Sequence, residues 1–349
     1  MWLLGLRDLQ WRRRRFLIAV LATALVFAMT LLMTGITSSM HAENHHIVRR
    51  FEADAWLVAR GTSGPFTATA LIPETDAAIV AAEPGVRRAD PIVVFRSTIP
   101  RGATLRDVNV LGLRFGGIGA PRVGTGRTPS AEGEVLADTA LGLHLGQTVP
   151  VSGRPVRVVG LVTGVSYYFG TPTLVMSVRD VQQIAFRGQP FVTAIVTRGV
   201  PARSTEGLRV MSNQSALADL ERPMKSSDQT LALVDTLLWI VAAGIIGSII
   251  YLSALERTRD FAVLKATGSS TRALLVGLAF QAVVLAVASA IVAAVFALLL
   301  APMFPFTVAI PSSAYSTLTG VAVVVGLLAS LAGLRRAVTV DPALAFGGA

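Results

Sequence analysis

Two stretches of the chain carry side chains that could do chemistry. The first contains His41, Glu43, His45 and His46, in which His41 and His45 would share one face of a helix. Imidazole and carboxylate groups bind zinc, but a zinc site closes around three or four such ligands. Because this cluster directly follows a long apolar run, we interpret it as a solvated stalk and expect no metal site.

The second stretch runs from Glu256 to Ser270, ERTRDFAVLKATGSS, and is the only charged segment between two long apolar runs. Each of those runs is long enough to cross a bilayer as a helix, which takes about 20 apolar residues. The segment therefore turns the chain around at one membrane face. Since short loops rich in lysine and arginine stay cytoplasmic, Arg257, Arg259 and Lys265 place it inside the cell.

The same stretch has the pattern of a short helix with a charged face and a small apolar ridge. Glu256 and Asp260 lie one turn apart, Asp260 precedes the apolar Phe261, Val263 and Leu264, and Gly268 supplies a stop signal. Such a helix suits a groove on a soluble partner. The alternative is a solvated loop, because runs of charge are usually solvated faces.

The stretch resembles the cytoplasmic signature of the FtsX-like and MacB-like permeases, broadly E-R-x-R-[DE]-x-x-x-L-[KR]-A-x-G-x-[ST], over its whole length. Shorter similarities lie at 5–9 (GLRDL), 335–337 (RRA) and 340–343 (VDPA). In that family the segment is the coupling helix that rests on a separate ATPase subunit. The resemblance implies this ATPase-coupling role for Glu256, Arg257, Arg259, Asp260, Phe261, Leu264, Lys265 and Gly268.

No motif in the sequence would let the chain hydrolyse ATP by itself. A phosphate-binding loop needs Gly-Lys followed by Ser or Thr, and neither lysine of the chain, Lys225 or Lys265, follows a glycine. The HExxH, GxSxG and GxGxxG motifs are also missing. We therefore expect no catalytic residue and no cofactor bound by this chain. The family resemblance implies that ATP and magnesium bind to two copies of a partner ATPase subunit.

The composition indicates a membrane protein. Hydrophobic residues make up 52% of the 349 residues, which exceeds the usual content of a soluble protein. The segments expected in the cytoplasm hold 11 Lys and Arg against 4 acids, whereas the large outer segment holds 20 against 16. Most of the net charge of +10 is therefore an orientation signal and not a footprint for nucleic acid. The absence of cysteine excludes disulfides and thiolate sites.

These patterns predict a membrane protein with four transmembrane helices and an extracytoplasmic α+β domain between the first two. The first apolar run is longer than the hydrophobic part of a secretory leader, so we expect a span there. We expect both termini in the cytoplasm and the protein in the bacterial plasma membrane. The expected parts are an interfacial helix (1–15), span one (16–37), the outer domain (38–228), a stalk end with span two (229–255), the coupling helix (256–270), span three (271–300), an external loop (301–314), span four (315–334) and a tail (335–349).

Short β-rich runs and helical stretches alternate in the outer domain. We expect strands at 51–59, 92–99, 108–113, 149–162, 173–178 and 191–197, and helices at 74–82, 139–145 and 179–186. The succession of 134–138, 143–149 and 157–162 resembles the periplasmic core domain of the MacB-like permeases. The alternative is any strand, helix and hairpin with a glycine-rich turn.

Two features inside the spans are candidates of a weaker kind. Asp235 is the only ionisable residue within a span, and we place it at the outer headgroups. Ala286, Ala290 and Ala294 form a ridge of small residues that would support a homodimer, although such ridges also pack within one subunit.

Three functions remain open from the sequence. The first is an ABC transporter permease subunit that moves its outer domain by mechanotransmission and exports or extracts a lipid, peptide or amphiphile. The second is a regulator of the FtsX type that activates a cell-wall hydrolase without transport. The third, a membrane-anchored enzyme, would need a convergent pair of titratable groups in the outer domain, and the spacing shows none.

Overall fold

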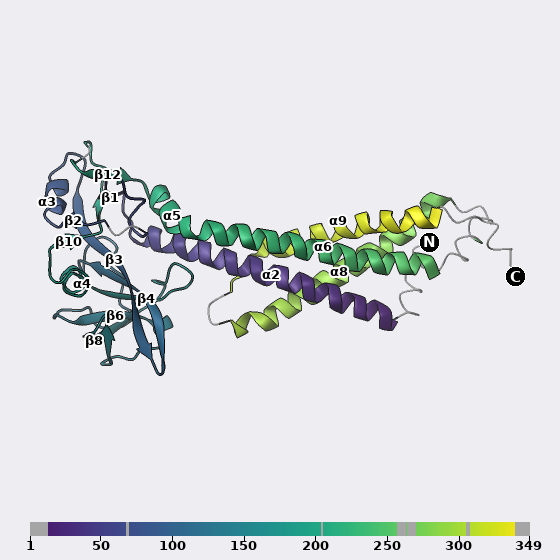
Figure 1. The fold of residues 1–349 in the computed structure, drawn as a ribbon, viewed down its shortest axis with the longest axis horizontal. Coiled ribbons are helices and arrows are strands. Elements are labelled where there is room, and N and C mark those ends of the chain that lie inside the picture. The colour runs from purple at the N-terminus through teal and green to yellow at the C-terminus, as the bar shows by residue number, and fades with distance from the viewer. Residues whose placement is uncertain are drawn as a thin grey trace. The chain divides into compact units, whose positions relative to one another are not determined.

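The computed structural model describes residues 13–67, 70–203, 205–256, 263, 270–304 and 308–338. The chain divides into two compact units: Met1–Ser39 together with Ser227–Ala349, and Met40–Ser226. The first unit is helical, and the second contains all the strands that the described residues form (Figure 1). We call them the membrane unit and the outer unit.

Four long helices build the membrane unit: α2 (Arg13–Arg50), α6 (Lys225–Glu256), α8 (Thr271–Leu300) and α9 (Ser312–Val338). Three stretches of the described chain are long and apolar enough to cross a membrane, namely Phe16–Arg50, Asn213–Leu252 and Val276–Met303. The described apolar stretch of the fourth helix, Ser312–Leu328, is shorter. The helical membrane fold expected from the sequence is therefore confirmed.

Small residues let these helices approach one another closely. On α8 the side chains of Ala282, Ala286 and Ala290 are buried in the core of the membrane unit. A side chain at Gly326 of α9 would lie 3.1 Å from the carbonyl oxygen of Ala282, so glycine suits this contact. Since Ala286 and Ala290 pack inside their own subunit, this ridge does not support the homodimer for which the sequence suggested it.

The outer unit is built on a ten-stranded sheet with the order β12-β1-β11-β3-β4-β9-β6-β8-β5, in which β7 also pairs with β8. A separate two-stranded sheet joins β10 and β2. The strands are β1 (Ala55–Ala59), β2 (Ile72–Pro73), β3 (Arg88–Arg101), β4 (Thr104–Leu113), β5 (Thr125–Gly126), β6 (Glu134–Asp138), β7 (Thr148–Val151), β8 (Arg154–Val162), β9 (Thr173–Ser177), β10 (Phe191–Val192), β11 (Ala194–Arg198) and β12 (Leu208–Met211). The short helices are α3 (Asp76–Ala81), η1 (Thr139–Leu141), α4 (Val178–Ala185), α5 (Asn213–Glu221) and η2 (Arg222–Met224). A last turn, η3 (Ala301–Met303), follows α8 in the membrane unit.

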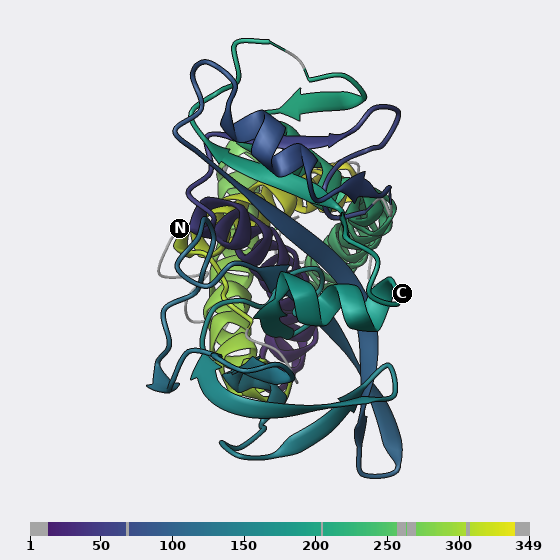
Figure 2. The same cartoon turned by 90° about the vertical axis from the view of Figure 1, so that its left-hand side faces the viewer.

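Strands β3 and β4 form a long hairpin that holds the sheet together (Figure 2). Residues 88–92 of β3 pair with β11, and residues 93–101 of β3 pair with β4. β4 in turn pairs in parallel with β9. The hairpin therefore joins the strands from both ends of the outer-unit sequence to the strands from its middle.

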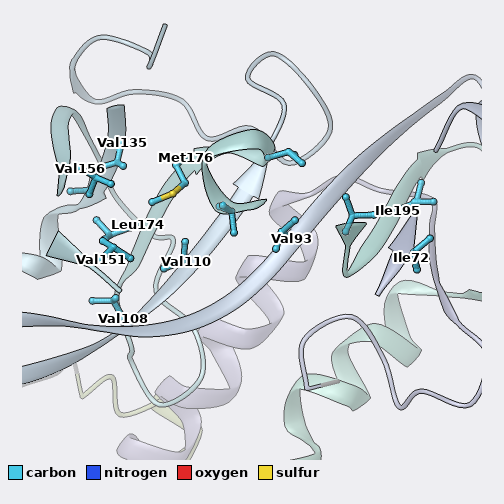
Figure 3. Packing of buried hydrophobic residues seen from close by; sticks show 14 of the residues in the cluster. Ile72, Val93, Val108, Val110, Val135, Val151, Val156, Leu174, Met176 and Ile195 are labelled. Atoms are coloured by element: carbon cyan, nitrogen blue, oxygen red, sulfur yellow. The ribbon is translucent and has the colours of Figure 1, made fainter. Parts of the chain in front are cut away.

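Alternation of side chains along the strands divides the apolar residues of the outer unit between two cores. The first core contains Val93 and Ile195 and is covered by α3 and α4, which contribute Val80 and Val181 (Figure 3). The second core contains residues of the opposite face of the sheet and is covered by α5 and by the last turns of α2. Its members include Trp56, Ile92, Val94, Val196, Ile47, Phe51, Ala216 and Leu220.

Most of the predicted strands are confirmed, and the differences occur at turns. The run at 51–59 forms a strand only from Ala55, because α2 extends to Arg50 and Glu52 has a positive φ of 48°. The helix predicted at 139–145 is a single turn, because Gly142 ends it with φ at 67°. The strand β12 and the helix α5 were not predicted.

Asp219 on α5 should be important for the stability of the outer unit. Its carboxylate is 1% exposed and accepts hydrogen bonds from the backbone N–H groups of Phe66 (3.0 Å) and Thr67 (3.2 Å) and from the Thr67 hydroxyl. Asp219→Ala would leave these donors unpaired and should lower the free energy of unfolding of the outer unit by about 3 kcal/mol. Native-state hydrogen exchange of the β1 and β11 amides in the full-length protein would measure this loss.

The matched control for this prediction is Asp107→Ala. Asp107 lies on β4 in the same unit and is exposed, so its removal should change the free energy of unfolding by less than about 0.5 kcal/mol. Equal exchange rates in the two variants would contradict the assigned role of Asp219.

Candidate functional site

The predicted coupling segment connects the end of α6 at Glu256 to the start of α8 at Thr271. Between these helices the structure describes Val263, which is 49% exposed, and Ser270, which is also exposed. Glu256 is the single predicted coupling residue that it describes, and it is exposed at the end of α6. The others lie outside the described residues: Arg257, Arg259, Asp260, Phe261, Leu264, Lys265 and Gly268.

One unbroken helix precedes the coupling segment. α6 has 32 residues, which at 1.5 Å per residue is about 48 Å, more than the roughly 30 Å of a hydrocarbon core. It begins at Lys225, in the outer unit, and ends at Glu256, in the membrane unit. Its apolar side chains at Leu233, Leu237 and Ile240 are more than half exposed, as expected of a surface that faces lipid.

Asp235 lies on α6 in the apolar stretch. One of its carboxylate oxygens is buried and has no hydrogen-bond partner, and no ion pair joins Asp235 to another described residue. The part of the chain that the structure describes also brings no group of three or more histidine and acidic side chains together in a form that could hold a metal ion. Asp235 therefore has no catalytic or ligating neighbour there.

The histidine cluster at the end of α2 makes structural contacts. His41 is hydrogen-bonded through Nδ1 to Oε1 of Glu221 at 2.8 Å, and His45 and His46 are exposed. The stalk predicted at this position is thus a helix whose last turns are built into the outer unit.

Asn44 fastens these last turns of α2 to the outer unit. Its side chain is fully buried, and its Oδ1 accepts a hydrogen bond from the backbone N–H of Tyr168 at 3.1 Å. Its Nδ2 donates to the sulfur of Met224 at 3.0 Å. Arg50, two turns later, donates to the carbonyl oxygens of Thr163 and Gly164 at 3.0 and 3.3 Å. A segment of the membrane helix therefore holds the 163–172 loop in place.

The loop itself is strained. Tyr168 and Phe169 have positive φ values of 57° and 61°, which cost non-glycine residues of the order of 1 kcal/mol each. Asn109 fixes the ends of the turn, because its Nδ2 donates to the carbonyl oxygens of Tyr167 (3.1 Å) and Thr171 (3.0 Å). Such strain persists only where the surroundings fix the conformation.

Sequence reasoning missed both Asn44 and this loop. A single asparagine in a helix and the string Tyr167-Tyr168-Phe169-Gly170 carry no pattern that joins them, because they lie more than a hundred positions apart in the chain. Only the fold shows that the loop and the end of α2 belong to one site.

The sequence is similar to known proteins along almost its whole length. Residues 233–342 match the FtsX-like permease C-terminal family, and residues 16–208 match the MacB-like periplasmic core domain. Two uncharacterized ABC transporter permeases of Mycobacterium tuberculosis (strain H37Rv), Rv0072 and Rv2563, are each 45% identical over 344 residues, which is 99% of both chains. Among solved structures, the periplasmic region of MacB from Actinobacillus actinomycetemcomitans is 14% identical and aligns with a TM-score of 0.36, over 50% of this chain and 95% of that one.

Asn44→Ala should release the 163–172 loop. Without the acceptor at Asn44 Oδ1, the Tyr168 amide loses its hydrogen bond, and its hydrogen exchange should become about tenfold faster, the effect of losing roughly 1.4 kcal/mol. Mass-spectrometric hydrogen exchange of peptides from this loop in the full-length protein would measure the change.

His45→Ala, one residue along the same helix but exposed, is the control and should leave exchange in the loop unchanged. Exchange of β8 should be the same in both variants, which shows that the outer unit remains folded. An unchanged loop in Asn44→Ala would refute the fastening role of Asn44.

Proposed function

Because the chain belongs to the FtsX-like ABC transporter permeases with a MacB-like periplasmic core domain, we propose that it couples ATP hydrolysis by a separate ATPase subunit to movement of its outer unit. The family membership confirms the resemblance seen in the coupling segment and makes the chain a membrane permease with a periplasmic-type domain. The rest of this proposal concerns how such a subunit would work.

One observation carries the coupling role. α6 runs without interruption from Lys225, in the outer unit, to Glu256, the first residue of the predicted coupling segment. A helix is stiff along its axis, because every residue of its interior is hydrogen-bonded to the next turn. A displacement of the coupling segment would therefore move the outer end of α6 as well.

The attachment of α2 supports the same mechanism. Ile47 and Val48 on its last turns are buried in the outer unit, and Asn44 and Arg50 bond to the 163–172 loop. The outer unit would thus follow movements of two membrane helices and not of flexible linkers. In this mechanism ATP and magnesium act on the partner ATPase, and this chain supplies only the mechanical connection.

The spans favour an apolar or amphiphilic cargo. The spans are strongly apolar, Asp235 is the one acidic side chain that the sequence places within them, and Arg272 lies at the entry to span three. A small polar solute would find no polar lining along such helices. We therefore propose export or extraction of a lipid, peptide or other amphiphile at the outer leaflet, by a homodimer of this chain in the bacterial plasma membrane that sits on two ATPase subunits.

The apolar ridge of the coupling segment is the most direct test of the coupling role. Phe261→Asp or Leu264→Asp would put a carboxylate into the apolar contact with the ATPase, and co-purification of the ATPase with the permease should fall at least tenfold. Co-purification from membranes that express both subunits would measure this.

Val263→Asp serves as the control. In a helical coupling segment Val263 would lie on a different face from Phe261 and Leu264, and its side chain is already 49% exposed. The variant should retain the ATPase. Intact co-purification of all three variants would rule out Phe261 and Leu264 as contact residues.

The orientation of the chain gives an independent test. A reporter inserted beside Lys265 should lie in the cytoplasm, and one inserted at Gly102, in the turn of the β3–β4 hairpin, should lie outside. With cysteine as the reporter in this cysteine-free chain, a membrane-impermeant thiol reagent added from outside should label the Gly102 site and leave the Lys265 site unlabelled. Labelling of the Lys265 site from outside would refute the coupling role.

A further inference from the structure

The outer unit contains a pocket of about 360 Å³, which lies in the size range of small-molecule sites. Among the residues that line it are the aromatic Phe66 and Tyr168, the apolar Val94 and one arginine, Arg96. Pro223 also lines it, two residues before α6 begins. The pocket thus combines apolar walls with one positive charge.

Arg96 is held in place while its hydrogen-bond donors stay available. Its guanidinium carbon lies 3.4 Å from the centre of the Tyr168 ring, a cation–π contact that fixes the plane of the group. The side chain is exposed, and none of the hydrogen bonds or ion pairs among the described residues involves it. Some other arginines of the unit are paired with acids, as Arg127 is with Glu134 and Arg198 with Glu52.

The strained loop provides the surface on which Arg96 stacks. Tyr168 keeps its positive φ, and the edge of the Phe169 ring packs against it at a centroid distance of 5.0 Å. Strain of this kind is common at ligand-binding sites, where it fixes a side chain before the ligand arrives. Here Tyr168 lines the pocket, and its backbone N–H donates to Asn44 on the last turns of α2.

A second polar group beside the pocket lacks a partner. The hydroxyl of Tyr167 is buried and makes no hydrogen bond to any residue that the structure describes, although the ring lies 5.7 Å from that of Phe66 in the pocket wall. Burial raises the pKa of Tyr167, and the charge of Arg96 opposes this with a smaller effect. The hydroxyl is therefore neutral at physiological pH and within electrostatic reach of Arg96.

The acid that bonds to the pocket wall does not cancel this positive charge by an ion pair. Asp219 is 1% exposed, and its oxygens accept from the backbone of Phe66 and from Thr67. Its carboxylate oxygens are therefore already occupied by donors of the pocket wall. The N–H donors of Arg96 remain available to a ligand.

We propose that this pocket binds an anionic amphiphile, with its apolar part against Phe66, Val94 and Tyr168 and its carboxylate or phosphate group on Arg96. Aromatic side chains bury apolar surface, and the planar fork of donors on arginine matches both anions. The inference rests on the proposed transport function only where it identifies the bound ligand with the transported cargo. Binding itself requires no ATPase.

Photoaffinity labelling of the full-length protein in nanodiscs of zwitterionic lipid tests the proposal. The probes are diazirine analogues of palmitate (a carboxylate), of lysophosphatidate (a phosphate) and of hexadecanol (neutral). Peptides that contain Phe66, Val94 or Tyr168 should be labelled by at least one acidic probe about tenfold more efficiently than by the alcohol. The stronger of the two acidic probes identifies the head group.

Arg96→Gln should reduce labelling by the acidic probe about tenfold and leave the weak labelling by hexadecanol unchanged. Arg96→Lys keeps the charge and should retain part of the labelling, and Arg101→Gln, at an exposed position on the same strand, should retain all of it. Unchanged hydrogen exchange of β3 in Arg96→Gln would show that the fold is intact.

Equal labelling of wild type and Arg96→Gln, or equal labelling by acidic and neutral probes, would overturn the proposal. These outcomes are independent of ATPase coupling. If Phe261→Asp and Leu264→Asp retain the ATPase while the pocket is still labelled, only the coupling role fails. If they lose the ATPase and the pocket is not labelled, only the assignment of the ligand fails.

Discussion

The constraint on which this protein depends is that a chain in the bilayer must satisfy its own backbone hydrogen bonds. This makes each crossing a helix, and here two helices continue beyond what a crossing needs. α2 extends to Arg50 and α6 begins at Lys225, so both passages between the membrane unit and the outer unit lie within helices.

The two cores of the outer unit share one sheet. Residues such as Val93 and Ile92 are neighbours on β3 and belong to opposite cores. Close packing on both faces of the sheet, with Ile47 and Leu220 in the second core, resists local distortion. The strained loop at Tyr168 is a defined exception, since hydrogen bonds from Asn44 and Asn109 fix its conformation.

Some charged side chains of the outer unit are held by hydrogen bonds to other charges, whereas Arg96 is held by an aromatic ring. Glu134 accepts hydrogen bonds from Arg127 and from the backbone of Ser130, and the Arg127 bond, with the smaller help of the backbone, lowers the pKa of Glu134 to about 2. Asp90 is similarly bound by Arg88. Arg96 makes only an aromatic contact, which orients its guanidinium group without neutralising it. Its position beside Tyr168 also makes the pocket sensitive to the loop that α2 holds.

The sequence by itself determined the elements that depend on local composition. Apolar runs defined the helices, alternation defined most strands, and the charged segment from Glu256 to Ser270 carried the family signature, because each of these signals lies within a few neighbouring residues. The strand β12 and the helix α5 were not predicted because they are short. The ridge at Ala286 suggested a dimer because the sequence does not show which helix packs against it. Only the tertiary structure brought Asn44, Arg96 and Tyr168 together. They come from a helix, a strand and a loop far apart in the chain, and their contacts exist only once the two cores have folded around the sheet.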